Sequence, residues 1–250
     1  MDKRVEAIPK VIHYCWFGGK EKPPIVEKCI KSWNRHLPHY EVKEWNEQNF
    51  DVSCNSYVEE AYAAEMYAFV SDFVRVHALY HEGGIYLDTD VEVLKPFDEL
   101  LKHQSFWGFE QGDYIATSTI GAVKGHPLIE EFLESYNKKK FIKEDGSFEQ
   151  LTNVKIVTEL LEKKGLKRNG LFQEIKQLGA FYPQPTFSPY DYINCRNLMN
   201  DSSFTIHHFH KGWLPTRDKV KGHLKRATAA IIGGDNIFRI RKFMSRGELK

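Results

Sequence analysis

The sequence FVSDFVRVHALYHEGGIYLDTDVE, residues 69–92, changes its hydrophobic period at a pair of glycines. Before the pair, apolar residues recur at helical spacing from Phe69 to Tyr80 and predict a largely buried helix. Gly83-Gly84 supplies the positive φ angles that commonly end a helix. After the pair, apolar and polar residues alternate from Ile85 to Val93, which predicts a strand.

The acidic sequence Asp88-Thr89-Asp90 lies within that predicted strand. Because side chains alternate along a strand, both aspartates project to the same side, together with Tyr86 and Glu92. Two neighbouring carboxylates repel one another unless a cation lies between them, and hard divalent cations prefer oxygen ligands. The pattern predicts a metal site with open positions for the phosphates of a substrate. A solvated acidic strand edge is the alternative, whereas a calcium loop of the EF-hand kind would need a glycine where Val93 stands.

Three polar residues, Ser71, Asp72 and Arg75, lie on the predicted helix that precedes this strand. Asp72 and Arg75 are separated by one helical turn, so they share a helix face and could form a simple surface ion pair. However, Phe, Val and Leu occupy most of the remaining helix surface, which predicts burial. Buried charges usually have a partner or a purpose, and we therefore include these residues in the candidate site.

The run SDFVRVHALYHEGGIYLDTDVEVLKP, residues 71–96, resembles the signature of the DXD-containing, sugar-binding glycosyltransferases grouped as family 32. This family includes bacterial capsule and lipopolysaccharide enzymes and the yeast initiating mannosyltransferases, and the spacing of the motif is similar to that of the large clostridial glucosylating toxins. The N-terminal IPKVIHYCWFGG, residues 8–19, resembles the opening strand and loop of the family. The resemblance covers residues 8–130 well and HHFHKGW, residues 207–213, weakly.

The resemblance implies an α/β fold of the GT-A type, a Rossmann-like mixed sheet flanked by helices that binds a nucleotide sugar. It implies Asp90 as a direct metal ligand and Asp88 as a residue shared between the metal and the ribose or sugar. Asp72 and Arg75 would hold sugar hydroxyls, and Arg75 would also neutralise phosphate charge. The catalytic residues expected in this way are Asp72, Arg75, Asp88 and Asp90, and those expected to bind the donor are Trp16, Ser71, Asp72, Arg75, Tyr86, Asp88 and Trp213.

Three histidines, His207, His208 and His210, lie close together on a predicted strand from Phe204 to Phe209. No cysteine or carboxylate accompanies them at zinc-ligand spacing, so a structural zinc site is not favoured. Alternation places His208 and His210 on one face of the strand and His207 on the other. By resemblance, a late segment of this kind completes the metal shell, and we expect His208 to be the third ligand beside Asp88 and Asp90.

The remaining sequence predicts further elements of an α/β sheet. Lys10–Tyr14 and Tyr40–Trp45 read as strands, and the helix between them starts at Pro24, which predicts a parallel β-α-β unit. The turn GGKEKPP, residues 18–24, lacks both the dinucleotide-binding and the P-loop glycine patterns. Other predicted elements are helices at 57–66, 128–136 and 153–164, strands at 105–110 and 115–123, and an irregular segment at 181–192.

The composition of 42% hydrophobic and 28% charged residues over 250 positions fits one soluble α/β domain. The net charge of +1 gives no reason to expect nucleic-acid binding. The N-terminus has no apolar signal region and no apolar run reaches the length of a membrane span, so we expect a cytoplasmic protein. The cysteines show no metal-ligand rhythm and are expected to be free thiols: Cys15, Cys29, Cys54 and Cys195.

The C-terminal part of the chain is strongly basic. From Arg217 to Lys250 there are ten Lys and Arg residues against three acidic residues. Residues 237–244, IFRIRKFM, interleave bulky apolar and basic residues, as helices that lie on anionic bilayers do. We therefore divide the chain into a GT-A catalytic domain, residues 1–215, and a basic amphipathic helical segment, residues 216–250, that packs on the domain or on a membrane.

The resulting hypothesis is a metal-dependent, retaining glycosyltransferase that moves a hexose from a UDP-sugar to a glycan acceptor in bacterial surface polysaccharide synthesis. Its cofactor would be Mn²⁺ or Mg²⁺, its acceptor an oligosaccharide or lipid-linked glycan, and its location the cytoplasm or the inner face of the plasma membrane. One alternative is a nucleotide-sugar or glycoside hydrolase, although glycosidase acids stand roughly 5–10 Å apart across a sugar bond, and aspartates one residue apart better suit one ion. The other alternative is a non-catalytic sugar-binding module on the same fold.

Overall fold

Helix α3 (Tyr67–Glu82) runs directly into strand β3 (Gly84–Leu87), which confirms the helix-to-strand prediction. The helix ends at Gly83, whose φ is +69°, and Gly84 follows with a φ of +108°. A Cβ atom at Gly84 would lie 2.7 Å from the carbonyl oxygen of Val11, so only glycine fits between the helix and the neighbouring strand. Seven of its sixteen residues are buried and only Ala68 and His81 are exposed, in line with the broad apolar surface of the sequence.

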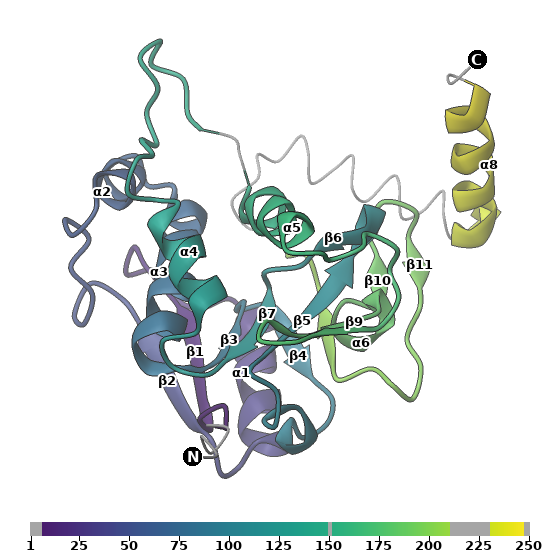
Figure 1. Cartoon of the computed structure of the whole chain (residues 1–250), viewed down its shortest axis with the longest axis horizontal. Helices are drawn as coiled ribbons and strands as arrows, with labels where there is room; N and C mark the ends of the chain where they lie inside the picture. The colour runs from purple at the N-terminus through teal and green to yellow at the C-terminus, as the bar shows by residue number, and fades with distance from the viewer. Residues whose placement is uncertain (1–6, 150–151, 211–230, 248–250) are drawn as a thin grey trace.

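The computed structural model describes residues 7–149, 152–210 and 231–247 (Figure 1). Its main sheet has the strand order β2-β1-β3-β7-β5-β9-β8, with β6 paired to β5. The β1–β2, β1–β3 and β5–β9 pairs are parallel, whereas β7 is antiparallel to both of its neighbours. The prediction of a mixed α/β sheet flanked by helices is therefore confirmed. Its strands are β1 (Val11–Cys15), β2 (Glu41–Trp45), β3, β5 (Ser105–Glu110), β6 (Tyr114–Ile115), β7 (Thr119–Ala122), β8 (Gln173–Ile175) and β9 (Gly179–Tyr182).

Helices cover both faces of this sheet. Trp33 of α1 packs with Ile12 and Ile85 in one buried cluster, and Val74 of α3 packs with Tyr86 and Ile120 in another. As predicted, α1 begins at Pro24 and connects the parallel strands β1 and β2. The helices are α1 (Pro24–His36), α2 (Ser56–Ala63), α3, α4 (Pro127–Glu134), α5 (Asn153–Lys163), α6 (Gln184–Phe187) and α8 (Gly234–Gly247), with 3₁₀ turns η1 (Asp98–Leu100) and η2 (Gln111–Asp113).

Two short strand pairs lie outside the main sheet. Strand β4 (Val91–Val93) pairs antiparallel with β12 (Thr205–His207), and β10 (Tyr190–Asp191) pairs antiparallel with β11 (Arg196–Asn197). The prediction of one strand from Ile85 to Val93 is therefore wrong, because β3 belongs to the main sheet and β4 to a different ladder. Likewise, α2 ends at Ala63 rather than Met66, and Glu65 adopts a φ of +56° that interrupts the helix.

Two other boundaries differ from the prediction. The segment expected to be irregular contains the end of β9, α6 and β10. The apolar stretch expected as one strand at 115–123 is divided between β6 and β7. The four cysteines are free, as expected from their spacing.

Buried histidines make the stability of this fold dependent on pH. His126 is 1% exposed and caps α4, since its Nδ1 atom accepts a hydrogen bond from the backbone N–H of Leu128 at 3.2 Å. Burial lowers the pKa of His126 from the ordinary 6.5 to about 4, so the unfolded chain binds a proton at higher pH than the folded protein does. The contribution of His126 is complete above pH 6.5 and is lost as the pH falls toward 4, at about 1.4 kcal/mol per pH unit.

We expect the variant His126→Asn to keep the cap, since asparagine is a favourable N-cap residue, while removing this titration. Urea unfolding between pH 7.5 and 4.5 should give a shallower loss of unfolding free energy in the variant than in the wild type. Histidine 39, which is exposed, provides the control variant His39→Asn. Parallel pH profiles for the wild type and His126→Asn would contradict the assignment.

Candidate functional site

The two aspartates lie in a turn at the carboxyl end of β3. The backbone N–H of Asp88 donates to the carbonyl oxygen of Ser118 at 2.8 Å, which continues the β3–β7 ladder by one residue. The N–H of Val91 then donates to the carbonyl oxygen of Asp88 at 2.9 Å and closes the turn. This turn, and not the alternation of a continuous strand, brings the two carboxylates together.

Asp90 is held by the chain that follows β12. His207 Nε2 lies 3.3 Å from Asp90 Oδ1, and the backbone N–H of His210 donates to Asp90 Oδ2 at 2.6 Å. The N–H of His208 also donates to the Asp90 carbonyl oxygen at 3.0 Å. Burial opposes ionisation of Asp90, but His207 and the backbone donor outweigh it and lower the pKa of this carboxyl. Asp90 is therefore an ionised carboxylate in a partly buried position.

Asp88, Asp90 and His207 form a group whose ligand atoms lie within 4.8 Å of one another. His207 Nδ1 is buried and has no hydrogen-bond partner in the described part of the chain. Although burial disfavours the imidazolium, Asp90 and Asp88 raise the pKa of His207, which shows that the site attracts positive charge. Two carboxylates and an imidazole suit Mn²⁺ or Mg²⁺, so the residues present fit a divalent cation.

The structure corrects the expectation for His208. Its Nε2 atom lies 2.8 Å from Oε2 of Glu92, and the same oxygen accepts from Lys28 Nζ at 2.7 Å. In the β4–β12 ladder, His207 is opposite Val91 and Ile206 is opposite Glu92, so His208 continues on the face of Glu92. His207 therefore replaces His208 as the candidate third ligand, and among the described residues His210 contacts Asp90 through its backbone N–H.

Arg75 connects the central helix to the Asp88–Asp90 turn. Its Nη2 atom lies 2.8 Å from Asp72 Oδ1 and 3.2 Å from Asp88 Oδ1. Its Nη1 atom donates to the carbonyl oxygen of Thr117 at 2.6 Å, and Nε donates to that of Ser71 at 3.3 Å. The guanidinium also lies 4.6 Å from the ring centre of Tyr86. Each guanidinium nitrogen already has a protein partner, so Arg75 orients Asp72 and Asp88. The expectation that Arg75 also neutralises phosphate charge is not supported by this arrangement.

The acids around Arg75 have different environments. Burial raises the pKa of Asp72 to about 6, with Asp88 adding to the shift and Arg75 opposing it. Both side-chain contacts of Asp88, from Arg75 and from the Tyr86 hydroxyl at 3.0 Å, go to Oδ1. Within the described residues Oδ2 of Asp88 therefore remains without a hydrogen bond. Ser71 Oγ donates to the carbonyl oxygen of Tyr67 at 3.0 Å, a contact within its own helix.

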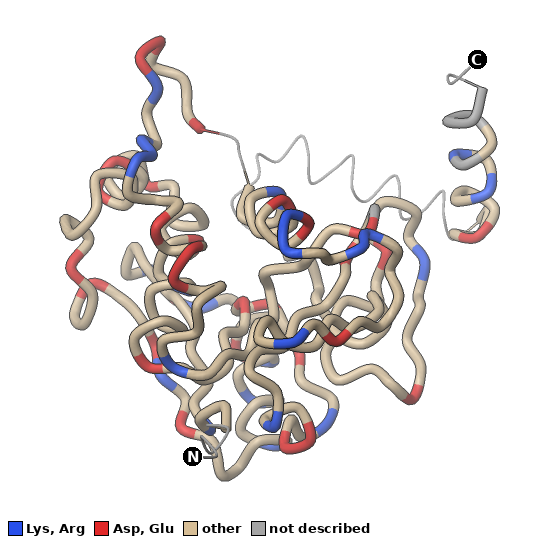
Figure 2. Tube along the Cα trace, in the orientation of Figure 1, with Lys and Arg blue, Asp and Glu red and all other residues tan. Residues whose placement is uncertain are grey.

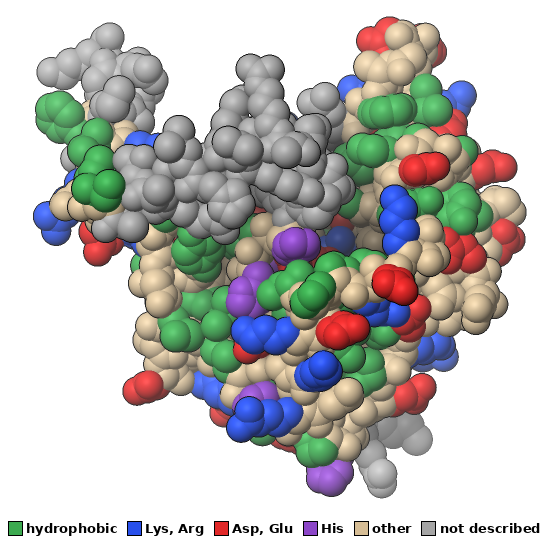
Figure 3. All heavy atoms as spheres, turned by 180° about the vertical axis from the view of Figure 1, so that it is seen from behind, with side chains coloured by type: hydrophobic (Ala, Val, Ile, Leu, Met, Phe, Trp, Pro, Cys, Tyr) green, Lys and Arg blue, Asp and Glu red, His purple; other side chains and the backbone are tan. Residues whose placement is uncertain are grey.

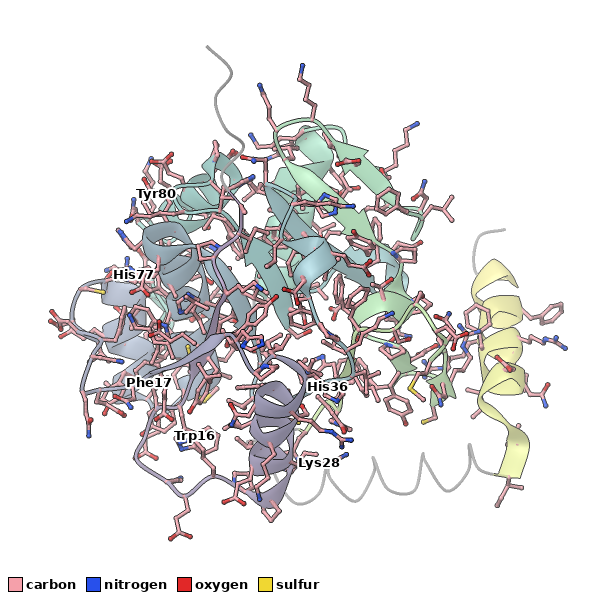
Figure 4. All side chains as sticks on the ribbon, turned by 90° about the horizontal axis from the view of Figure 1, so that it is seen from below. Trp16, Phe17, Lys28, His36, His77 and Tyr80 are labelled. Atoms are coloured by element: carbon pink, nitrogen blue, oxygen red, sulfur yellow. The ribbon has the colours of Figure 1, made fainter. Side chains whose placement is uncertain are left out.

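Trp16 lies in the loop between β1 and α1 (Figure 4). It follows the strand that neighbours β3, so it emerges at the same edge of the sheet as Asp88. Its indole N–H donates to the carbonyl oxygen of Lys20 at 2.6 Å, and Lys22 Nζ lies 5.7 Å from its ring centre. Trp213, the other tryptophan expected near the donor, lies outside the described residues.

Glu110 is a residue that the sequence reasoning did not select. It is the last residue of β5, and its carboxylate interacts electrostatically with His207, Asp88 and Arg75. Burial raises the pKa of Glu110, His207 opposes this shift and Asp88 adds to it. The available signal was positional, since an acidic residue at the end of a predicted strand shares the sheet edge with the DXD motif.

Comparison with known proteins gives a family match within this region. Residues 23–107 match the model described as the glycosyltransferase sugar-binding region containing the DXD motif. Inositol phosphoceramide mannosyltransferase 3 of Schizosaccharomyces pombe is 31% identical over 134 residues, covering 49% of this chain and 35% of that protein. An uncharacterized glycosyltransferase of Acanthamoeba polyphaga mimivirus is 23% identical over 223 residues, covering 83% of this chain and 84% of that protein. The chain spans about a third of the length of the yeast relatives.

Solved glycosyltransferase structures also align with this chain. The galactosyltransferase LgtC, in complex with donor and acceptor sugar analogues, aligns with a TM-score of 0.43 and 12% identity, covering 88% of this chain and 95% of LgtC. PaToxG glycosyltransferase aligns with a TM-score of 0.46 and 18% identity, covering 64% of this chain and 70% of PaToxG.

Proposed function

We propose that this chain, whose residues 23–107 match the DXD-containing sugar-binding region of glycosyltransferases, transfers a hexose from a UDP-sugar to a glycan acceptor. The observation that supports the proposal is the group formed by Asp88, Asp90 and His207. Its two aspartates belong to the DXD motif inside the matched residues, and they lie at the sheet edge where open α/β sheets bind their ligands.

Asp88, Asp90 and His207 would hold a divalent cation, Mn²⁺ or Mg²⁺. When bound, such a cation supplies Lewis-acid stabilisation of the leaving diphosphate. Protein groups position the two aspartates: Arg75 orients Asp88, and the backbone N–H of His210 holds Asp90 in place. Asp72, on the same helix face as Arg75, would accept hydrogen bonds from sugar hydroxyls.

The proposed reaction retains the anomeric configuration, as the family resemblance implies. The route would be a front-face substitution in which the departing UDP oxygen assists deprotonation of the acceptor hydroxyl. We place the reaction in bacterial surface polysaccharide synthesis, with an oligosaccharide or lipid-linked glycan as the acceptor.

The direct test is a panel of nucleotide sugars incubated with the full chain and Mn²⁺, Mg²⁺ or a chelator. UDP release and thermal shift are the measurements, and GDP-mannose belongs in the panel because two relatives are named mannosyltransferases. We expect cation-dependent UDP release that increases with a glycan acceptor. Release that no acceptor alters would favour a hydrolase, and sugar binding without release would favour a non-catalytic sugar-binding module.

Binding to an anionic membrane surface is part of this proposal. In the described residues, no helix has the length and apolar character needed to cross a bilayer. Helix α8 lies beside β11 at one side of the molecule and carries Arg and Lys residues (Figures 1 and 2). Its first turns contact the domain, since Arg196 Nη1 lies 3.5 Å from Asp235 and the Arg196 guanidinium lies 4.1 Å from the Phe238 ring centre. Farther along, Ile240 is 54% and Phe243 is 83% exposed.

We expect the full chain to sediment with phosphatidylserine-containing vesicles and not with neutral phosphatidylcholine vesicles. In the cell, the corresponding surface is the cytoplasmic face of the plasma membrane. The double variant Ile240→Ser/Phe243→Ser should weaken this binding at least about tenfold, because each side chain would bury apolar surface in the lipid. Leu171→Ser/Phe172→Ser, which alters another exposed apolar pair, is the matched control. Equal binding by both double variants would contradict the role of α8.

The face of the molecule drawn in Figure 3 offers no second candidate surface for an anionic partner. Figure 3 shows acidic and basic side chains interspersed over the face that it presents, with no extended basic area among the described residues. This agrees with the near-neutral net charge of the whole chain. The protein is therefore not proposed to bind nucleic acid.

A further inference from the structure

Glu110 lies where three segments of the chain meet beside the Asp88–Asp90–His207 group. It ends β5, and the next residue, Gln111, donates from Nε2 to Asp191 Oδ1 of β10 at 2.8 Å. Strand β12 is joined to the same region, since Thr205 Oγ1 donates to the carbonyl oxygen of Phe187 at 2.6 Å. Strand β7 is antiparallel to both β3 and β5, so β3 and β5 run in the same direction and Glu110 ends its strand at the same sheet edge as Asp88. The Gln111–Asp191 contact holds this end of β5 beside β10, and the electrostatic interactions of Glu110 with His207, Asp88 and Arg75 agree with this position.

The Glu110 side chain is only partly exposed, yet it makes no hydrogen bond or ion pair with the described residues. Three buried polar atoms of neighbouring segments are also unpartnered within the described chain: Oε1 of Gln111, the residue after Glu110, Oγ of Ser118 and Nδ1 of His207. Ser118 adjoins Asp88 directly through the backbone hydrogen bond described above. Leaving a buried polar group unpaired costs roughly 1–3 kcal/mol, so a polar ligand is the expected partner of the partly exposed Glu110 carboxylate.

The chemistry of this carboxylate selects the kind of ligand. An ionised carboxylate only accepts hydrogen bonds, so Glu110 suits a group that carries hydroxyl donors. The negative charge of Glu110 would repel a diphosphate at close range. Glu110 is also outside the group of described residues that could share one cation. The uncharged, hydroxylated part of the donor fits these conditions best.

We propose that Glu110 contacts the transferred sugar, accepts hydrogen bonds from its ring hydroxyls, and thereby determines which hexose the protein uses. This inference rests on the proposed function, because it assigns one part of a nucleotide-sugar site. It adds a fourth acid to the candidate site, after Asp72, Asp88 and Asp90, at the end of β5.

The test compares binding of UDP with binding of intact UDP-glucose and UDP-galactose, each with Mn²⁺, by calorimetric titration. Glu110→Gln and Glu110→Ala should leave the Kd for UDP within about twofold of the wild type. The better-bound UDP-hexose should lose at least about tenfold in affinity, since hydrogen bonds to charged groups are the strong ones. Glu174→Gln, an exposed acid on β8, is the matched control and should bind both ligands normally.

Monodeoxy analogues of the same UDP-hexose identify the contact. Removing the hydroxyl that Glu110 binds should weaken binding to the wild type and have little further effect in Glu110→Ala, as expected for one shared interaction. If the wild type binds UDP-hexoses and both variants keep the full preference over UDP, the Glu110 contact is refuted while the proposed function stands. If the wild type binds neither UDP nor UDP-hexoses, the proposed function fails and this inference fails with it.

Discussion

Replacing Asp90 by asparagine is expected to lower cation-dependent UDP release by at least about a thousandfold. A cation that neutralises a leaving diphosphate supplies several kcal/mol of transition-state stabilisation, and each 1.4 kcal/mol corresponds to a factor of ten in rate. Asparagine has nearly the same shape, so the hydrogen bond from the His210 backbone can persist while the negative charge is lost. Measurements of UDP release and of Mn²⁺-dependent UDP binding should therefore both show the loss.

Glu92→Gln is the matched control for this experiment. Glu92 lies two residues beyond Asp90, but its carboxylate contacts His208 and Lys28 on the other face of the β4–β12 ladder. The control should retain cation dependence and most of the activity. If Asp90→Asn retained wild-type activity and the same response to Mn²⁺, the proposed metal site would have to be abandoned.

Replacing Arg75 by methionine is expected to destabilise the fold by about 3–5 kcal/mol, the usual cost of removing one partner from a buried ion pair. Arg75 is 5% exposed, and its loss leaves Asp72 and Asp88 facing one another and the Thr117 carbonyl without its donor. For a chain of this length the melting temperature should fall by about 10 °C. Urea unfolding at pH 7.5 measures the change directly, and activity should fall because Asp88 is no longer oriented.

Two further variants separate the role of Arg75 from a general packing defect. Arg75→Lys keeps the positive charge, but an ammonium group cannot donate hydrogen bonds to Ser71, Thr117, Asp72 and Asp88 at once. Its stability should therefore lie between those of the wild type and Arg75→Met. Adding Asp72→Asn to Arg75→Met should recover part of the lost stability, because it removes one of the two facing charges. A cost below about 1 kcal/mol for Arg75→Met would show that the ion pairs contribute little.

The sequence was sufficient to predict the elements that have a strong hydrophobic period. The α3–β3 unit, the start of α1 at Pro24 and the parallel β1-α1-β2 unit follow from helical spacing, strand alternation and glycine or proline positions. The mixed sheet was expected from the family resemblance. The turn at Asp88–Asp90 could not be predicted in this way, because Val91 and Val93 continue the alternation of Ile85 and Leu87. Only the pairing of β4 with β12, more than a hundred residues later, shows that the strand is interrupted.

The wrong prediction of His208 as the third ligand has a similar cause, since it also depends on the pairing of β4 with β12. Alternation correctly separates His207 from His208, but it does not show which face of β12 meets the aspartates, because that depends on the register with β4. The burial of Arg75 was predicted from its apolar helix, whereas its four protein partners come from backbone and side-chain positions that the sequence does not place together. The roles of Asp72, Ser71, Tyr86 and Trp16 in binding a donor remain predictions.

The attachment of the His207–His210 segment to Asp90 links distant parts of the chain. The hydrogen bond between His210 and Asp90 joins residues 120 positions apart, and a cation held by Asp88, Asp90 and His207 would tie the same ends of that long loop. A cation that needs both Asp88–Asp90 and His207 as ligands binds only the folded protein, and it therefore favours the folded state by mass action. The supply of the cation would thus affect the stability of the protein as well as its activity. In a cell that lacks the cation, a larger fraction of the protein would be unfolded and exposed to proteases, so its amount would fall together with its activity.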